Sequence, residues 1–422
     1  AIHPPLVEVG VFSPIMDKVT NCHLKIRRRM CMTDVLVLGA GYAGMRACKV
    51  LAKSKLDLNV TLVNKNSYHY DATALHTIAA GTNVPENIEM DIRDAVSDKI
   101  KFVQDTVVDI NREKNEVDLA ENGSLHFDYL FNALGFEPET FGTPGADDIA
   151  LKISNVDNAL EDYHTILAVL EKYQETKDKS LLSIAVVGGG FTSIELLGEL
   201  AYQIPKWAKK YGFAKDDMKI TCIAPGFLPM FDKKYADYAQ KYLESKGITF
   251  IMGGTVSEVK TDGVIYGDDK IFLPANITFW TAGVRGNKIM AKAGYDQHRD
   301  RVAVNDDMSL SDFPNEYIIG DVSAVKDPES GRMYPTTGQI SIVEATNAVK
   351  NLEAKLQNKQ PVKFVYNSLG TVCSLGPYSG IADINLLGVH LKLKGIIVPP
   401  LKHAIFKRSA FELSGLKAAL QS

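Results

Sequence analysis

The sequence predicts an α/β protein with two dinucleotide-binding units, one inserted into the other, followed by a C-terminal amphipathic segment. Two glycine-rich turns carry this prediction, because each follows a short apolar strand and opens a stretch with helical periodicity. A late apolar strand that ends on Gly320-Asp321 indicates that the chain returns to the first unit after the insertion. At 422 residues the chain is long enough for two to three domains.

The first turn, Gly39-Ala40-Gly41-Tyr42-Ala43-Gly44, follows the apolar strand 35–38. Gly39 permits the tight turn, Gly41 lets the backbone approach a pyrophosphate, and Gly44 lets the helix pack closely on the strand. The N-terminus of the following helix offers unpaired N–H groups to phosphates. This order of strand, turn and helix predicts a Rossmann-type nucleotide site. The next strand ends at Asn64-Lys65 rather than on an acid, and the Asn64 amide can still pair with ribose hydroxyls through a weaker, neutral hydrogen bond.

The second turn, Gly188-Gly189-Gly190-Phe191-Thr192-Ser193, follows strand 184–187, and its third glycine is replaced by Ser193. The next strand of this unit, 220–223, runs into Ala224-Pro225-Gly226 where an acid usually binds the adenosine ribose. The nearest acid is Asp232. Two interpretations stay open: a nicotinamide-dinucleotide site of reduced affinity, and a βαβ unit that only packs.

Composition excludes several other classes of function. The net charge of −4 gives no indication of nucleic-acid binding. The five cysteines contain no CxxC pair, which argues against a disulfide framework, a zinc site and a dithiol redox centre, and fits a reducing cytoplasm. His69, His76 and His126 lack metal-ligand spacing, so we predict structural roles for them and no metal.

Several stretches, in this order and spacing, resemble the type II NADH:quinone oxidoreductases, single-chain FAD enzymes of bacterial and mitochondrial membranes. The resemblance runs from about residue 35 to 415. It rests on GAGYAG (39–44), VNKNSYHYDATALHTIAAGT (63–82), ALGFEPETFG (133–142), GFTSIELLGEL (190–200), TAGVRGN (281–287), IIGDVSA (318–324), PTTGQI (335–340) and GTVCSLG (370–376). It implies a two-dinucleotide-binding-domain flavoprotein of glutathione-reductase-like fold. FAD would bind in the first unit and NADH in the second, and hydride transfer to the flavin would be followed by electron transfer to a membrane quinone, menaquinone or ubiquinone, without proton pumping.

The resemblance also implies the site residues. Positions that match FAD contacts are Gly39, Gly41, Tyr42, Ala43, Gly44, Asn64, Lys65, Val107, Gly320, Asp321, Gly338 and Gln339. Those expected to hold NADH are Gly188, Gly190, Phe191, Thr192 and Gly283. Glu195 matches a glutamate beside flavin and nicotinamide, a role we favour over the alternative of a first-turn acid stabilised by its helix dipole. Lys402 matches a C-terminal lysine near the flavin, so Glu195 and Lys402 are the candidate catalytic residues.

These assignments imply a domain order. Residues 1–31 form an extension outside the fold, residues 32–150 and 285–365 form the two parts of the FAD domain, and residues 151–284 form the inserted NAD(H) domain. Residues 366–422 form the membrane-surface and quinone-side region.

The chain departs from the family pattern in two places. GQISIVEA (338–345) keeps Gln339 but has Val343 where a second glutamine is expected at the quinone site, which would cost one hydrogen bond of about 0.5–1.5 kcal/mol. The strand before Ala224 lacks its usual Glu. Both departures leave alternatives open: a flavin reductase with another donor or acceptor, or an FAD-binding, non-catalytic, partner-binding paralogue. A sulfide:quinone reading of Cys373 would need a second, partnered cysteine.

The C-terminal segment is basic and amphipathic. Residues 391–422 carry one acid, Glu412, against six cations: Lys392, Lys394, Lys402, Lys407, Arg408 and Lys417. A stripe of Phe406, Ala410, Leu413, Leu416 and Leu420 follows Pro399-Pro400. Such a helix indicates a protein bound at the cytoplasmic face of the cell membrane. The alternative is a helix that packs on the body or on the partner of a homodimer.

Overall fold

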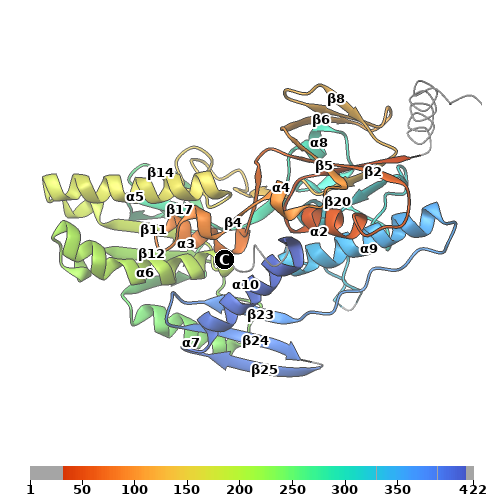
Figure 1. Cartoon of the computed structure of the whole chain (residues 1–422). Coiled ribbons are helices and arrows are strands. Elements are labelled where there is room, and N and C mark those ends of the chain that lie inside the picture. The colour runs from red at the N-terminus through yellow and green to blue at the C-terminus, as the bar shows by residue number, and fades with distance from the viewer. Residues whose placement is uncertain (1–31, 329, 387, 415–422) are drawn as a thin grey trace, which may run out of the picture.

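The computed structural model describes residues 32–328, 330–386 and 388–414. Two α/β units lie side by side, and a C-terminal sheet and helix lie along one edge of both (Figure 1). The extension 1–31, and the predicted stripe residues Leu416 and Leu420, lie outside the described residues.

The first unit is a five-stranded parallel sheet in the order β21-β9-β1-β2-β5. Its strands are β1 (Thr33–Leu38), β2 (Leu58–Asn64), β5 (Ile100–Gln104), β9 (Tyr129–Asn132) and β21 (Glu316–Ile318). The apolar run of β1 is buried and pairs with β2 in the register Val35↔Val60. Helices α2 (Tyr42–Leu51) and α9 (Gly338–Leu356) share this core, so residues from the two ends of the sequence complete one unit.

Smaller elements surround this sheet. One antiparallel sheet consists of β6 (Val107–Asn111), β7 (Glu116–Leu119) and β8 (Ser124–His126), and a small sheet of β19 (Gln297–His298), β20 (Arg301–Ala303) and β22 (Ser323–Ala324) lies near α8 (Ile289–Lys292). The segment between β2 and β5 holds β3 (Tyr68–Tyr70), η1 (Ala72–Ala74), α3 (Leu75–Ala79), η2 (Pro85–Asn87), β4 (Glu89–Asp91) and α4 (Ile92–Ala95). Through this segment the first unit reaches the second, because Leu75 and Ile78 of α3 belong to the core of the second unit.

The second unit repeats the pattern with a parallel sheet in the order β13-β12-β11-β17. Its strands are β11 (Ser183–Val187), β12 (Lys219–Ala224), β13 (Ile248–Met252) and β17 (Ile277–Trp280), and its helices are α5 (Val156–Thr176), η3 (Lys179–Leu181), α6 (Phe191–Tyr211), η4 (Lys215–Asp217) and α7 (Lys233–Glu244). A meander of β14 (Val256–Lys260), β15 (Gly263–Tyr266) and β16 (Ile271–Pro274) adjoins it. The chain enters this unit through β10 (Phe136–Pro138) and leaves it through β18 (Val284–Gly286), and these two strands pair antiparallel. The predicted fold, one dinucleotide unit inserted into another, is confirmed.

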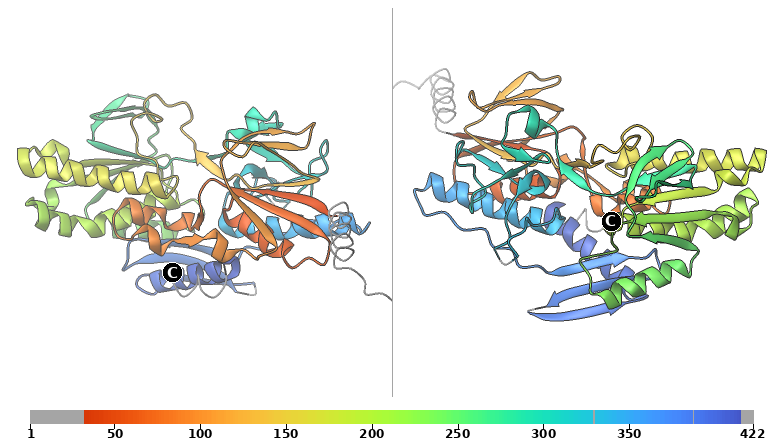
Figure 2. Two further views of the ribbon diagram at one scale, coloured as in Figure 1. Left: turned by 45° about the horizontal axis from the view of Figure 1, so that its top comes forward. Right: turned by 180° about the vertical axis from the view of Figure 1, so that it is seen from behind.

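The C-terminal region is an antiparallel sheet followed by one helix. It consists of β23 (Gly370–Ser374), β24 (Gly380–Leu386), β25 (Val389–Lys394) and α10 (Val398–Ser414). Figure 2 shows α7 of the second unit beside this sheet, where Tyr235 Oη donates to Lys392 O and Tyr238 Oη pairs with Ser379 Oγ. Among the described residues, no helix is both long and apolar enough to cross a bilayer.

The predicted lipid-facing stripe on α10 is wrong for two of its members. Ala410 and Leu413 are each 1% exposed and pack on the first unit, Ala410 with Met90 and Leu413 within the α2–α9 core. The apolar residues that α10 exposes are Ile405 and Phe411, on another side of the helix. The sequence pattern marked the side of the helix that packs on the body, since burial in protein and burial in lipid favour the same residues.

Candidate active site

The glycine turn of the first unit has the shape of a nucleotide cradle. A Cβ atom on Gly39, whose φ is +90°, would lie 2.3 Å from Ala133 O, and one on Gly44 would lie 1.8 Å from Gly39 O. Close packing therefore requires both glycines. A Cβ on Gly41, just before α2, would meet nothing within 4 Å. The turn thus leaves open space in front of the helix N-terminus, where the pyrophosphate of a dinucleotide fits.

Asn64 supports this turn directly. Its Oδ1 accepts the Ala40 N–H at 2.9 Å, while its Nδ2 donates to Asn66 O at 2.9 Å. Lys65 is exposed beside it. The amide therefore fixes the end of β2 against the glycine turn, which is a structural role beside the predicted ribose contact.

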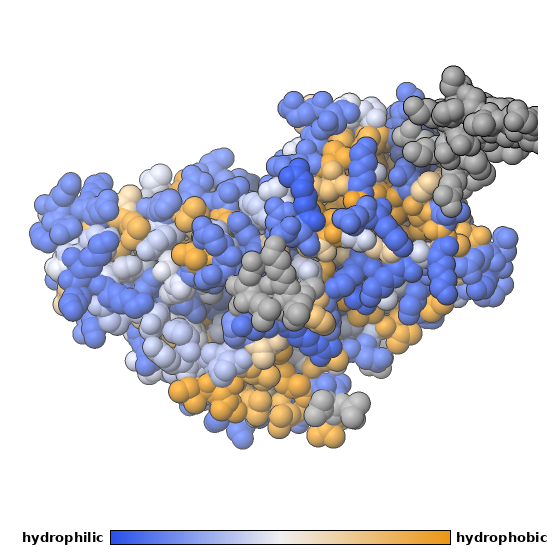
Figure 3. Space-filling model, in the orientation of Figure 1, coloured by the Kyte–Doolittle hydropathy of each residue, from blue (hydrophilic) through white to orange (hydrophobic). Residues whose placement is uncertain are grey.

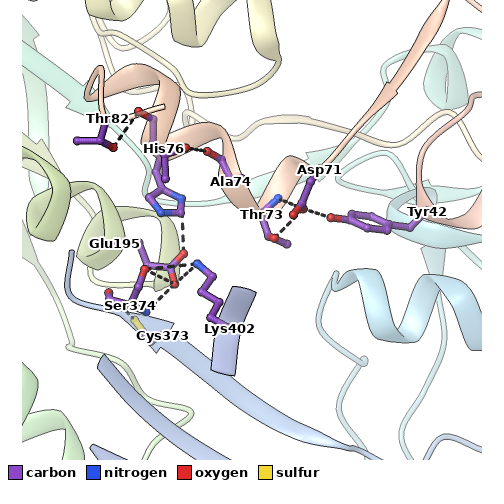
Figure 4. A network of polar contacts seen from close by, with 11 residues as sticks. Tyr42, Asp71, Thr73, Ala74, His76, Thr82, Glu195, Cys373, Ser374 and Lys402 are labelled. Carbon is purple, nitrogen blue, oxygen red and sulfur yellow. Dashed lines mark hydrogen bonds and ion pairs between the residues drawn. The ribbon is translucent and has the colours of Figure 1, made fainter. Parts of the chain in front are cut away.

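Two hydrogen bonds link this turn to the β3–η1 segment, one through Tyr42 at the start of α2 and one through His69 of β3. Tyr42 Oη donates to the Asp71 carboxylate, which also accepts the Thr73 N–H at 2.8 Å (Figure 4). His69 Nδ1 lies 2.7 Å from Ala40 O, and burial lowers the pKa of His69, so the imidazole is neutral and Nδ1 donates. His69 Nε2 is buried and has no hydrogen-bond partner within the described part of the chain. An unpartnered buried polar atom beside the glycine turn fits a site that a bound nucleotide would complete.

Gly320 and Asp321, which follow β21 in the later part of the chain, lie beside the glycine turn of the first unit. Gly320 has a φ of +75°, and a Cβ there would lie 3.0 Å from Ala43 Cβ. Burial raises the pKa of Asp321 to about 6. The segment is held from α9 by Glu344, whose carboxyl accepts the Gly320 N–H at 2.6 Å and the Ser323 Oγ–H at 2.9 Å. Glu344, which departs from the expected quinone motif, therefore supports the turn that carries Asp321.

Gln339 lies at the start of α9, where Gly338 packs on Tyr42: a Cβ on Gly338 would be 3.2 Å from the Tyr42 ring. Gln339 Nε2 donates to Gly370 O at 3.2 Å, and its Oε1 accepts the Tyr366 Oη–H at 3.2 Å. The Gln339 amide thus links the first unit to β23 of the C-terminal sheet.

The second glycine turn is also open at its helix. A Cβ on Gly188, at φ +131°, would be 2.6 Å from Thr281 O, whereas one on Gly190 would meet nothing within 4 Å. Ser193, which replaces the third glycine, is buried, and its Oγ lies 2.8 Å from Thr281 Oγ1. The added bulk of the serine is therefore accommodated by a hydrogen bond, and the open space before α6 remains.

A cavity of about 690 Å³ opens in front of this second turn. Phe141 lies at its rim, where the ring is 3.3 Å from a Cβ built on Gly283. Its lining consists of Phe141, Thr143, Val187, Gly188, Gly189, Gly190, Ile223, Pro225, Gly226, Pro229, Gly254, Thr255, Val256, Trp280 and Ala282. A cavity of this size, at the carboxyl ends of parallel strands and before a helix N-terminus, suits a dinucleotide.

A buried polar cluster lies where α6 meets the C-terminal region (Figure 4). Glu195 Oε1 accepts from Lys402 Nζ at 2.6 Å, from the Ser374 N–H at 2.8 Å and from Ser374 Oγ at 3.2 Å. Glu195 Oε2 lies 3.6 Å from His76 Nδ1 on α3. We call Glu195, Lys402, Ser374 and His76 the Glu195 cluster. It joins α3, α6, β23 and α10, so both units and the C-terminal region contribute to it.

The charges in this cluster are set by burial and by pairing. Burial alone would raise the pKa of Glu195, but Lys402 above all, together with His76 and the Ser374 N–H, holds it below its usual value. Burial lowers the pKa of His76 to about 4, which outweighs the attraction of Glu195. At neutral pH the cluster therefore holds a carboxylate and a neutral imidazole. Lys402 reaches it with a side chain that is 24% exposed, so water has access to the ammonium group.

Cys373 adjoins the cluster, but burial and the nearby Glu195 raise the pKa of its thiol well above the ordinary value. The other cysteines in the described part of the chain, Cys48 and Cys222, are buried in the cores of the two units. Cys373 is therefore a packed thiol, with no cysteine partner in that part of the chain.

Comparisons with known proteins agree with this geometry. Residues 33–351 match the pyridine nucleotide-disulphide oxidoreductase family. Type II NADH:quinone oxidoreductases of Staphylococcus saprophyticus and Staphylococcus aureus are each 36% identical to the chain over 396 residues, which span 92% of this chain and 97% of each relative. The chain belongs to the type II NADH:quinone oxidoreductase family.

Solved structures show the same fold for this type II NADH:quinone oxidoreductase. NDH2 from Plasmodium falciparum, in complex with NADH, is 19% identical and matches with a TM-score of 0.79 over 90% of this chain and 96% of that one. The sulfide:quinone oxidoreductase of Aquifex aeolicus, 20% identical, matches with a TM-score of 0.73 over 90% of this chain and 91% of that one.

The structure brings Glu195 and Lys402 together although 207 positions separate them in the sequence. It places Val107 at the start of β6, and Phe191 and Thr192 in the first turn of α6. Sequence reasoning missed Ser374 and underrated His76, which lie within stretches quoted for the resemblance. No spacing rule could join them to Glu195, because four separate elements converge there.

Proposed function

We propose that this chain is an FAD-dependent NADH:quinone oxidoreductase that works at the membrane surface without pumping protons. The observation that carries the proposal is the Glu195 cluster, a buried carboxylate–ammonium pair that lies where the two units and the C-terminal region meet. The overall reaction, NADH + H⁺ + quinone → NAD⁺ + quinol, consumes a proton. A site that performs it needs groups that hold protons away from bulk water, and this cluster provides them.

The first unit would hold FAD. Its glycine turn leaves the space beside Gly41 for the pyrophosphate, and the half-buried Asp321 would accept hydrogen bonds from ribitol hydroxyls. His69 Nε2 is the buried polar atom that such a ligand would satisfy. When bound, FAD accepts a hydride from the nicotinamide and passes the electrons to the acceptor. The protein supplies alignment and the proton-holding groups.

The second unit would hold NADH in the cavity before α6. The N–H groups at the start of α6, beside Gly190, would bind the pyrophosphate, and Thr143 and Thr255 supply neutral hydroxyls along the wall. The aromatic and aliphatic lining, including Phe141 and Trp280, excludes water from the bound nucleotide.

Lys402 and Glu195 would hold and position protons. Lys402 is accessible to water on one side and bonded to Glu195 on the other, so a proton that it gives up can be replaced from solvent. Ser374 fixes the carboxylate with two hydrogen bonds, which keeps Glu195 in one orientation. Gln339 and Tyr366 form the neighbouring pair of neutral hydrogen-bonding groups, suited to a quinone carbonyl.

The C-terminal surface would hold the protein at the cytoplasmic face of the membrane. Val389, Leu391, Ile396 and Ile397 are 50–71% exposed, and Figure 3 shows apolar surface gathered over β24 and β25. Lys392 and Lys394 lie on β25, and Lys407 and Arg408 lie on α10, the helix that follows it. Apolar side chains next to cations suit an anionic lipid surface, from which menaquinone or ubiquinone can reach the site without entering water.

Steady-state turnover tests this function. Purified, flavin-loaded protein should oxidise NADH in the presence of menadione or a short-chain ubiquinone, with one NADH consumed per quinone reduced. Turnover with oxygen but with neither quinone would assign a different acceptor. A flavin-loaded protein that fails to oxidise NADH with any of these acceptors would be a non-catalytic paralogue.

A further inference from the structure

We infer that the second unit accepts NADPH as well as NADH, with a preference for either of no more than about tenfold. The inference rests on the proposed function and specifies the electron donor of the same site. Three features of the structure support it: the end of β12, the uncharged cavity, and the pairing of several charged groups beside it.

The end of β12 lacks the group that normally makes the selection. In such units an acid at this point binds the 2′-hydroxyl of NAD and repels the 2′-phosphate of NADP, whereas an arginine nearby attracts that phosphate. Here β12 ends on Ala224, which is fully buried, and continues into Pro225 and Gly226. The chain therefore has neither selecting group at the position where one is usual.

The cavity carries no charge of either sign on its wall. All fifteen described residues that line it are neutral, and Thr143 and Thr255 are the ones among them with side-chain hydroxyls. A hydroxyl can donate to a phosphate oxygen or exchange hydrogen bonds with a ribose hydroxyl. This wall therefore favours neither nucleotide through charge.

Several charged groups on the segments that adjoin this wall are paired. Asp232, which precedes α7, forms an ion pair with Lys392 of β25, and Lys233 pairs with Asp237 at 2.8 Å. On the opposite rim the Arg299 guanidinium lies 4.9 Å from the centre of the Phe141 ring and pairs with Glu139 at 2.8 Å. In each of these pairs the partner offsets the charge, which weakens its action on a 2′-phosphate.

The loop after β12 is fixed against the glycine turn. Leu228 is buried, and its N–H donates to Gly189 O at 2.9 Å. A Cβ on Gly189 would lie 1.9 Å from Gly226 O, so the two segments touch. Because the short loop is held there, Asp232 stays at α7 and does not take the place of the missing acid.

Gly226 provides the test. A Cβ at this position meets nothing within 4 Å, so Gly226→Glu puts a carboxylate at the cavity wall, and Gly226→Gln matches its size without the charge. Two quantities are measured on the flavin-loaded protein. One is the pair of dissociation constants of NAD⁺ and NADP⁺ by calorimetry, and the other is the pair of anaerobic second-order rate constants for flavin reduction by NADH and NADPH.

For the unchanged protein we expect both ratios, NADPH to NADH and NADP⁺ to NAD⁺, to lie within about tenfold of one. In Gly226→Glu, repulsion of the 2′-phosphate should lower the NADPH:NADH rate ratio at least about tenfold relative to Gly226→Gln. A preference beyond about a hundredfold in the unchanged protein would overturn the inference while leaving the proposed function intact. Equal ratios in the Glu and Gln variants would also overturn it. Failure of both nucleotides to reduce a flavin that dithionite reduces would overturn the proposed function itself.

Discussion

Lys402 Nζ lies 2.6 Å from Glu195 Oε1, and this contact ties the C-terminal helix α10 to helix α6 of the second unit. The carboxylate is 5% exposed, so its charge depends on this partner. Removing one member of a buried ion pair leaves the other charge uncompensated, which costs more than the pair itself contributes.

Lys402→Met should therefore destabilise the protein by roughly 3 kcal/mol and raise the pKa of Glu195. Denaturant unfolding of the flavin-loaded protein measures the loss. Lys394→Met is the matched control, because Lys394 is exposed and its ammonium lies over the Tyr238 ring instead of in a buried pair. The double variant Glu195→Gln/Lys402→Met should recover part of the loss. Equal stabilities of Lys402→Met and Lys394→Met would contradict the pairing.

The cluster also predicts how stability changes with pH. The pKa of His76 is about 4 in the folded protein and about 6.5 when the chain is unfolded, so between these values the unfolded chain binds the extra proton. The free energy of unfolding is therefore unaffected by His76 above about pH 6.5, and it falls by roughly 3 kcal/mol as the pH drops to 4. Glu195, whose folded pKa is depressed, adds a further loss at lower pH. His76→Asn should flatten the slope between pH 6.5 and 4, and an unchanged slope would rule out His76 as its source.

Substitutions at two glycines of the first turn should distinguish an effect on folding from an effect on cofactor binding. In Gly44→Ala the new methyl group would lie 1.8 Å from Gly39 O, so we expect a protein that folds poorly. In Gly41→Ala the methyl group meets no protein atom within 4 Å, but it enters the space assigned to the pyrophosphate. That variant should fold with a native far-ultraviolet spectrum and bind FAD at least about tenfold more weakly. Full flavin content in Gly41→Ala would place the flavin elsewhere.

The C-terminal surface predicts membrane binding that two substitutions weaken. The double variant Ile396→Lys/Ile397→Lys replaces side chains that are 71% and 52% exposed. Each substitution removes about 1.5–3 kcal/mol that burial of the isoleucine in lipid would contribute to membrane binding. Partition onto phosphatidylglycerol vesicles, measured by co-sedimentation, should fall at least tenfold, a change of ~1.4 kcal/mol or more. Ile271→Lys/Phe272→Lys, an apolar pair on β16 that is 47% and 44% exposed, is the control and should bind normally. An equal drop in vesicle binding for both double variants would show that the C-terminal surface is not the membrane anchor.

The sequence predicted the two units well because their signals are local. A strand, a glycine turn and a helix lie within about twenty residues, and the φ of +90° at Gly39 and the close packing of Gly44 on Gly39 O follow the roles expected of the first and third glycines. The Glu195 cluster was only half predicted. Glu195 and Lys402 came from the resemblance, whereas the Ser374 N–H is a backbone group that carries no sequence signal.

Helix α10 shows where periodicity misleads. Ala410 and Leu413 have the spacing of an apolar face, and they do form one, but that face packs on the first unit. The exposed Ile396 and Ile397 precede the helix and belong to no period. Glu344 is a similar case. It lies where the sequence departs from the expected quinone motif, and nothing in the sequence predicted that its carboxyl accepts the Gly320 N–H.

Anaerobic titration of the flavin-loaded protein with NADH tests the central claim most directly. If the two units work together, NADH at micromolar to low-millimolar concentration will bleach the visible absorption of the flavin, and added menadione will restore it. If dithionite bleaches the flavin and neither NADH nor NADPH does, the second unit is not a nicotinamide site and the proposed reaction is wrong.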